Sequence, residues 1–189
     1  ADINARWMAG VLTGAAALAW QDGLDWHGDV QLKGLALAQL DRRLPAALAG
    51  TLKVSGHLQD RLQINLQELS LRSGRARFKA KGELGDVSSL HWQLSADDLA
   101  ELWSEAGGKA RLDGQLAGSL LSPRQQLQGK IEQFKWMELA LTQLKLQGDV
   151  DLAGVEPWQL DVQLAELGYQ GHTLDSIRVQ LQGEAENHI

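Results

Sequence analysis

Apolar residues recur at every second position along most of this chain. A typical run contains Leu24, Trp26, Gly28, Val30 and Leu32. A period of two is the pattern of β-strands that have one apolar and one polar face. Such runs, separated by turn-forming pairs such as Asp60-Arg61 and Ser73-Gly74, predict about eleven strands. The sequence therefore predicts an all-β protein.

One segment departs from this alternation and predicts a short helix over 97–106. Helical spacing relates Leu99, Leu102, Trp103 and Ala106. Ser95 and Asp98 resemble a capping box in which Asp replaces the usual Glu, and Gly107 is suited to the position after a helix.

Two other segments each fit two interpretations: a helix or short turns for 37–48, and a signal peptide or a strand for 8–19. Segment 37–48 has leucines on one side, but Pro45 interrupts a continuous helix, so we expect one or two short turns there. Segment 8–19 is as apolar as the core of a signal peptide and too short to span a bilayer. Because Leu12, Gly14, Ala16, Leu18 and Trp20 alternate, we expect it to be a strand.

Composition limits the possible partners and the surroundings of the protein. The 189 residues carry a formal net charge of −6, which argues against nucleic acid as the main partner. No cysteine is present, which fits an oxidising compartment without proving one. The chain begins Ala-Asp-Ile without Met, so we expect it to be a piece of a longer protein. Because no segment is long enough to span a bilayer, we expect any membrane anchor to lie outside these residues.

An imperfect internal repeat organises the chain. The stretches AGTLKVSGHL (49–58) and GGKARLDGQL (107–116) match at an offset of 58 residues. We therefore expect one continuous segment over 1–189, with repeats over about 37–94 and 96–152 followed by closing strands over 157–185.

Short connections between strands predict antiparallel neighbours, and the apolar face then needs a cover. A two-sheet sandwich, a closed barrel or a single sheet curled into a trough would each provide one. Closed architectures are the commoner solution. Glycines on the apolar phase favour the trough, because a repeated bend folds a sheet along a line. The expected crease consists of Gly28, Gly56, Gly82, Gly114, Gly129, Gly148 and Gly183.

Sequence signatures of catalysis are missing. The chain contains no Gly-x-Gly, no Gly-x-Ser-x-Gly and no His-Glu-x-x-His, and its five histidines lack metal-ligand spacing. We therefore predict no enzyme, no metal and no cofactor. Arg75, Arg77, Lys79 and Lys81 form a basic ladder on the polar phase, for which a solvated strand face is favoured over a phosphate-binding site.

The order of motifs over 107–152 resembles the repeats of the TamB family. The stretch reads GGKARLDGQLAGSLLSPRQQLQGKIEQFKWMELALTQLKLQGDVDL. A Leu-x-Gly-x-Leu strand is followed by Ser and Pro, by Leu-x-Gly-x-Ile, by an aromatic hairpin at Phe134-Lys135-Trp136, and by a closing Leu-x-Leu-x-Gly-Asp-Val. Residues 19–35 and 75–102 are similar to the middle of such chains, and the similarity covers 11–152 best.

This resemblance, to a family that belongs with the AsmA-like proteins, implies the following fold, location and function for the chain. The fold is a β-taco: an elongated antiparallel sheet, with two short helices here, folded into a hydrophobic half-pipe. The location is the periplasm of a Gram-negative bacterium, in a protein anchored in the inner membrane. The function is movement of phospholipid along the groove toward the outer membrane or, alternatively, assembly of outer-membrane proteins with the barrel partner TamA.

The residues expected to line such a groove follow from the apolar phase of each strand. They are Leu24, Trp26, Val30, Leu32, Leu52, Val54, Leu58, Ile64, Phe78, Trp92, Leu112, Leu116, Leu120, Ile131, Leu144, Leu146, Val150, Trp158, Leu160, Val162, Val179 and Leu181.

Overall fold

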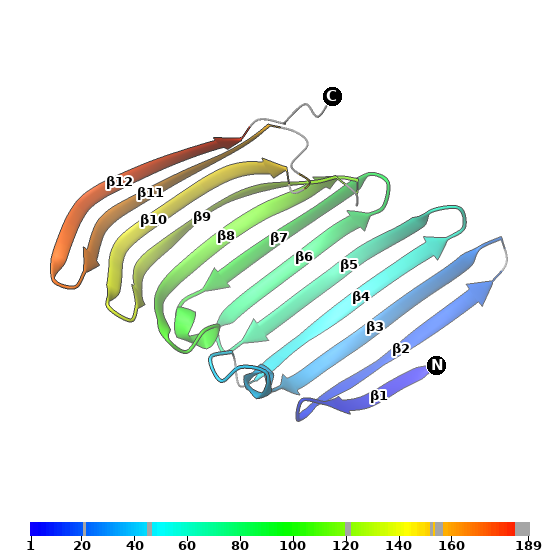
Figure 1. The fold of residues 1–189 in the computed structure, drawn as a ribbon. Helices are drawn as coiled ribbons and strands as arrows, with labels where there is room; N and C mark the ends of the chain where they lie inside the picture. The colour runs from blue at the N-terminus through cyan, green and yellow to red at the C-terminus, as the bar shows by residue number, and fades with distance from the viewer. Residues whose placement is uncertain (21, 45–46, 120–121, 152, 154–156, 184–189) are drawn as a thin grey trace.

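Twelve β-strands form one sheet in the computed structural model, which describes residues 1–20, 22–44, 47–119, 122–151, 153 and 157–183 (Figure 1). The strands are β1 (Asp2–Trp7), β2 (Gly10–Trp20), β3 (Leu24–Leu35), β4 (Leu48–Leu58), β5 (Leu62–Ser73), β6 (Ala76–Leu84), β7 (Ser88–Ala96), β8 (Ala106–Gly118), β9 (Pro123–Trp136), β10 (Leu139–Asp151), β11 (Trp158–Tyr169) and β12 (His172–Gly183). Two 3-10 turns, η1 (Leu37–Gln39) and η2 (Leu99–Glu101), complete the described elements.

The sheet is an open meander in which every strand is antiparallel to the next one along the chain. Its spatial order is the sequence order from β1 to β12. The antiparallel prediction is confirmed, and the sandwich and barrel alternatives are wrong, since the described strands belong to one open sheet. Strand β1 was not predicted, because its sequence DINARW lacks the alternation seen elsewhere. Segment 8–19 is confirmed as mainly strand, with Met8 and Ala9 in the turn before β2.

The predicted helix over 97–106 is wrong. Only the single 3-10 turn η2 forms, and β8 already begins at Ala106 with Gly107 inside the strand. Asp98, and not Ser95, caps the turn by accepting a hydrogen bond from the backbone N–H of Ala100 at 3.0 Å. The segment is too short for a stable helix of its own, so tertiary packing decides its shape.

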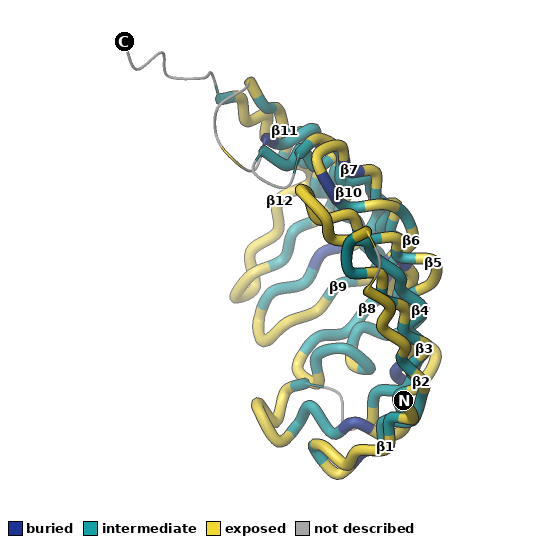
Figure 2. Tube along the Cα trace, turned by 90° about the vertical axis from the view of Figure 1, so that its right-hand side faces the viewer, coloured by how far each residue is buried: buried dark blue, intermediate teal, exposed yellow. Residues whose placement is uncertain are grey.

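Three of the six buried apolar residues in the described part of the chain lie under the η2 segment. Among the described residues, the buried apolar ones are Leu35, Ala76, Ala80, Ala96, Ala110 and Leu141. Leu99 and Leu102 of the η2 segment, with Ile131, pack against the three neighbouring alanines Ala76, Ala96 and Ala110. Figure 2 shows the consequence, a single layer in which most of the trace is half-buried or exposed. One layer with so little buried surface has no closed core.

The edge of the sheet that carries η1 and η2, called here the η rim, is held by contacts between segments distant in sequence. The backbone N–H of Ser104 donates to the carbonyl of Arg43 at 2.9 Å. The Arg43 guanidinium lies 3.2 Å from the Glu105 carboxylate and 5.6 Å from the centre of the Trp103 ring. At the same rim, a Glu101 carboxylate oxygen accepts from the backbone N–H groups of Arg75 and Ala76 at 2.8 and 2.7 Å.

Strands β8–β11 bend close to the η rim. Gly108, Gln133 and Glu166 all have positive φ, at 114°, 53° and 50°. The pairing places these residues beside one another on β8, β9 and β11, with Thr142 of β10 between Gln133 and Glu166. Figure 1 shows β9–β12 curving at their η-rim ends, whereas β2–β5 run straighter. A row of left-handed residues therefore marks this curvature.

Candidate functional site

The apolar side chains of successive strands form one continuous face. The register pairs Leu12 with Leu32, Val30 with Leu52, and Leu71 with Phe78. It continues through Leu94 opposite Leu112 and ends with Val162 opposite Val179. We call this surface the apolar face and the opposite surface the polar face.

All described members of the predicted lining lie on the apolar face. Leu120 lies outside the described residues, and the other 21 are half-buried or exposed, none of them buried. Phe78 and Trp92 stack there with ring centres 6.3 Å apart. Apart from the η2 segment over its alanines, the described residues include no second layer on this face. Side chains of the kind that usually form a core therefore remain half-buried or exposed here.

The glycines of the predicted crease lie opposite large side chains. Gly56 pairs with Trp26, Gly114 with Trp92, and Gly183 with Trp158. A Cβ added at Gly114 would stand 2.8 Å from the Trp92 ring, and one added at Gly148 only 2.7 Å from Leu160 Cδ1. Glycine here gives a neighbouring large residue the room to lie flat on the sheet. This role of the glycines could not be predicted from the sequence, because it depends on which residues the register places opposite them.

The same glycines are not in one register row. Gly28 and Gly82 share a row through Val54 and Leu66, whereas Gly114 and Gly148 share another through Leu127. Of the seven, only Gly82 has a positive φ, at 145°. The row of left-handed residues at Gly108, Gln133 and Glu166 is the line of bends that the structure does contain, and it was not predicted. A crease through the seven glycines stays a prediction.

A β-bulge hid two members of the apolar face from sequence analysis. In β5 the apolar phase runs through Ile64 and Leu66 and then shifts to Leu69 and Leu71. The register slips between Leu66 and Leu69, so the even and odd positions exchange faces. The sequence does contain a sign of this bulge: the apolar residues change from even-numbered positions, as at Leu66, to odd-numbered ones, as at Leu69 and Leu71.

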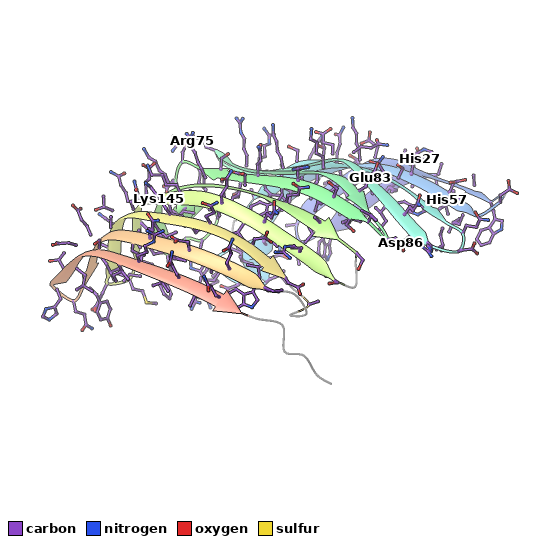
Figure 3. The ribbon with its side chains drawn as sticks, turned by 90° about the horizontal axis from the view of Figure 1, so that it is seen from above. His27, His57, Arg75, Glu83, Asp86 and Lys145 are labelled. Carbon is purple, nitrogen blue, oxygen red and sulfur yellow. The ribbon has the colours of Figure 1, made fainter. Side chains whose placement is uncertain are left out.

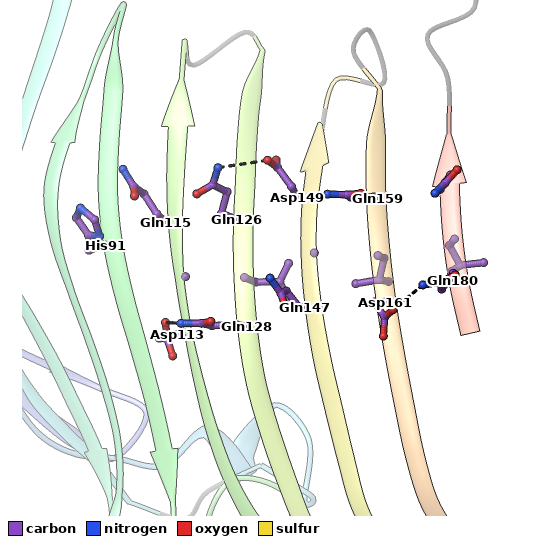
Figure 4. Close-up of a pocket in the computed structure, with 16 residues that line it drawn as sticks. His91, Asp113, Gln115, Gln126, Gln128, Gln147, Asp149, Gln159, Asp161 and Gln180 are labelled. Carbon is purple, nitrogen blue, oxygen red and sulfur yellow. Dashed lines mark hydrogen bonds between the residues drawn. The ribbon is translucent and has the colours of Figure 1, made fainter. Parts of the chain in front are cut away.

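The polar face carries ladders of amides and carboxylates. A shallow hollow on it, shown in Figure 4, crosses β7–β12 and is lined by residues such as Gln115, Gln126, Gln147 and Gln159. Gln128 donates to Asp113 at 2.9 Å, and the hydrogen bonds of Asp161 to Gln180 and Arg178 hold the pKa of its carboxyl below the usual range. Such ladders join neighbouring strands by side-chain hydrogen bonds.

The described residues contain neither a metal-ion cluster nor a membrane-spanning helix. In that part of the chain, His, Asp and Glu side chains nowhere gather in threes with a geometry that could hold a metal ion. No helix within it has the length and apolar character needed to cross a bilayer.

Comparison with known proteins supports the resemblance that the order of motifs indicated. The family described as "TamB, N-terminal domain" matches residues 58–189. The chain belongs to the TamB family. A curated relative, the translocation and assembly module subunit TamB of Haemophilus influenzae, is 21% identical over 201 residues. The match covers 89% of this chain but only 16% of that protein. No solved structure matches this chain significantly.

Proposed function

We propose that this chain is a periplasmic segment of an inner-membrane-anchored protein, and that its apolar face carries phospholipid toward the outer membrane. The observation that supports this most is the lining of 21 described residues on one face, none of them buried. Exposed apolar surface of this extent is rare in proteins that have no partner for it.

In this proposal the sheet acts as a half-pipe whose apolar face holds acyl chains while head groups stay in water at its mouth. Each methylene buried there is worth about 0.8 kcal/mol. The described lining contains no charged side chain that would fix a head group at one place. A uniform apolar surface favours sliding, because no deep local minimum holds the lipid.

The experiment uses Leu112 and Leu146, which lie on either side of Gly129 in one register row. We expect native mass spectrometry of the purified chain to detect co-purified phospholipid, and the L112D/L146D variant to lose most of it. Two carboxylates would have to lose water when an acyl chain crosses that row. If the carboxylate variant does not fold, L112S/L146S gives the same test with a smaller expected loss.

The matched control is Q93D/Q163D, which adds the same charge at two exposed positions of the polar face. We expect it to retain phospholipid at the level of the parent chain. Retention of lipid by a folded L112D/L146D variant, or absence of lipid from the parent chain, would contradict the proposal.

A second candidate is a scaffold for outer-membrane protein assembly together with TamA. The observation behind it is that β1 and β12 each pair with a described strand on one side only. Open edges bind extended clients by adding a strand. Photo-crosslinkers on β12 are then expected to capture polypeptide. Capture of lipid alone, at positions on the apolar face, would contradict this alternative.

A further inference from the structure

A row of cations crosses the polar face from β5 to β12. The basic row consists of Arg72, Arg77, Arg111, Lys130, Lys145 and Arg178. Each residue is paired in register with the next strand, and only two positions of the row, Ser95 on β7 and Gln163 on β11, are uncharged. Figure 3 shows Lys145 among the polar side chains that stand out from the sheet.

Repulsion between the cations of the basic row destabilises the folded chain when no anionic partner is bound. Arg72 lies opposite Arg77, and Arg111, Lys130 and Lys145 follow one another on three successive strands. Like charges directly opposite in a sheet are destabilising. Opposite charges lie directly across from each other elsewhere on the polar face, where Lys53 stands between Asp29 and Glu68.

Most members of the basic row form no direct ion pair with the described residues. Lys130 is paired with Glu132, and Arg178 with Asp161 at 2.8 Å. In the part of the chain that the structure describes, Arg72, Arg77, Arg111 and Lys145 form no ion pair. These four side chains are exposed, although the chain as a whole carries a net charge of −6. The cations are therefore concentrated at one level of the sheet and available to an anion from outside.

The spacing and linear arrangement of the cations favour one class of anionic partner over another. Neighbouring strands are about 4.8 Å apart, so the seven steps from β5 to β12 cover about 34 Å, with about 7 Å between successive cations on average. Side chains on one face of an extended polypeptide are about 6.7 Å apart. A bilayer presents anions over an area instead, and it would also contact Asp113, Glu132 and Asp161 beside the row.

We propose that the basic row binds an extended acidic segment of another polypeptide, with a carboxylate at every second residue. The segment lies across β5–β12 on the polar face, perpendicular to the strands, and its carboxylates pair with the exposed cations. This site is on the opposite face from the proposed lipid surface, so neither activity depends on the other.

The test is fluorescence anisotropy with the full 189-residue chain and two labelled twelve-residue peptides at low ionic strength. One peptide alternates Glu and Ser, and the other has six Glu followed by six Ser. We expect the alternating peptide to bind several-fold more tightly, because all its carboxylates then face the row. The R111Q/K130Q/K145Q variant should weaken its binding by about tenfold, as expected for three exposed charge pairs.

The control variant R6Q/K33Q/K53Q removes the same charge from β1, β3 and β4, outside the basic row, and is expected to bind the peptide like the parent. The single K145Q variant, at an exposed side chain without an ion pair, repeats the test with about threefold weakening if the triple variant does not fold. Equal weakening by both triple variants, equal binding of both peptides, or binding to vesicles of phosphatidylethanolamine and phosphatidylglycerol without binding to either peptide would overturn the proposal.

Discussion

The two faces of this sheet are stabilised by different means. On the apolar face, glycines alternate across strands with Trp and Leu, so the position of each Cβ decides whether neighbours fit. On the polar face, exposed amides and ions form pairs that are individually worth little. Substitutions should therefore lower the free energy of unfolding most on the apolar face, less at the η rim and least on the polar face.

The largest effect is expected for Gly82→Ala on the apolar face. Gly82 has a φ of 145°, and an added Cβ would overlap the Ser89 carbonyl and stand 2.7 Å from Leu90 Cα. Strained backbone together with an overlap that flexible atoms cannot relieve should lower the free energy of unfolding by about 2–4 kcal/mol. Urea unfolding followed by circular dichroism measures this change.

Gly28→Ala is the matched control, since Gly28 lies in the same register row. Its added Cβ would meet only Val54 Cγ1, at 3.8 Å, and its φ is not positive. We expect stability to be unchanged or to rise by up to about 1 kcal/mol. A similar loss in both variants would mean that any side chain at these positions is harmful, whatever the local space.

An intermediate effect is expected for Glu101→Ala at the η rim. The Glu101 carboxylate accepts from the N–H groups of Arg75 and Ala76, and Ala76 is 1% exposed. Loss of these charged hydrogen bonds should lower the free energy of unfolding by about 1–3 kcal/mol and raise amide exchange at Ala76. Glu105→Ala, which breaks only the exposed ion pair to Arg43, should cost less than about 1 kcal/mol. Equal losses would contradict a special role of Glu101.

Sequence alternation predicted β2–β12 but missed β1 and, beyond the bulge in β5, the face on which Leu69 and Leu71 lie. It succeeded for these strands because a period of two is a property of a single strand and does not depend on its neighbours. The family resemblance predicted the absence of a closed architecture, which pattern alone did not.

Features that depend on the pairing of strands could not be predicted from the sequence. The partners of Gly56 and Gly114, the bulge beyond Leu66 and the bends at Gln133 and Glu166 all require the register. The apolar residues over 97–106 do have helical spacing. However, Leu99 and Leu102 pack on three alanines of the sheet, and the segment forms only a single 3-10 turn. The basic row is invisible for the same reason, because its members are far apart along the chain.

The smallest effect is expected on the polar face, where His57 is paired with Asp25. The two side chains are 2.7 Å apart, and the hydrogen bond to Asp25 raises the pKa of His57 above its usual value. Because the folded-state pKa is raised, the pair contributes its full stability below the pKa of His in the unfolded chain. That contribution disappears as the pH rises through the raised pKa of His57.

NMR titration of the His57 ring measures this pKa directly. Asp25→Asn removes the charged acceptor and should lower the pKa of His57, with almost no change in the urea midpoint because the pair is exposed. Asp29→Asn removes a carboxylate from the same strand and face, opposite Lys53 and without a hydrogen bond to His57, and should leave the His57 titration unchanged. An equal shift in both variants would assign the raised pKa to the general negative charge of β3. A loss of stability as large as that of Gly82→Ala would contradict the difference between the faces.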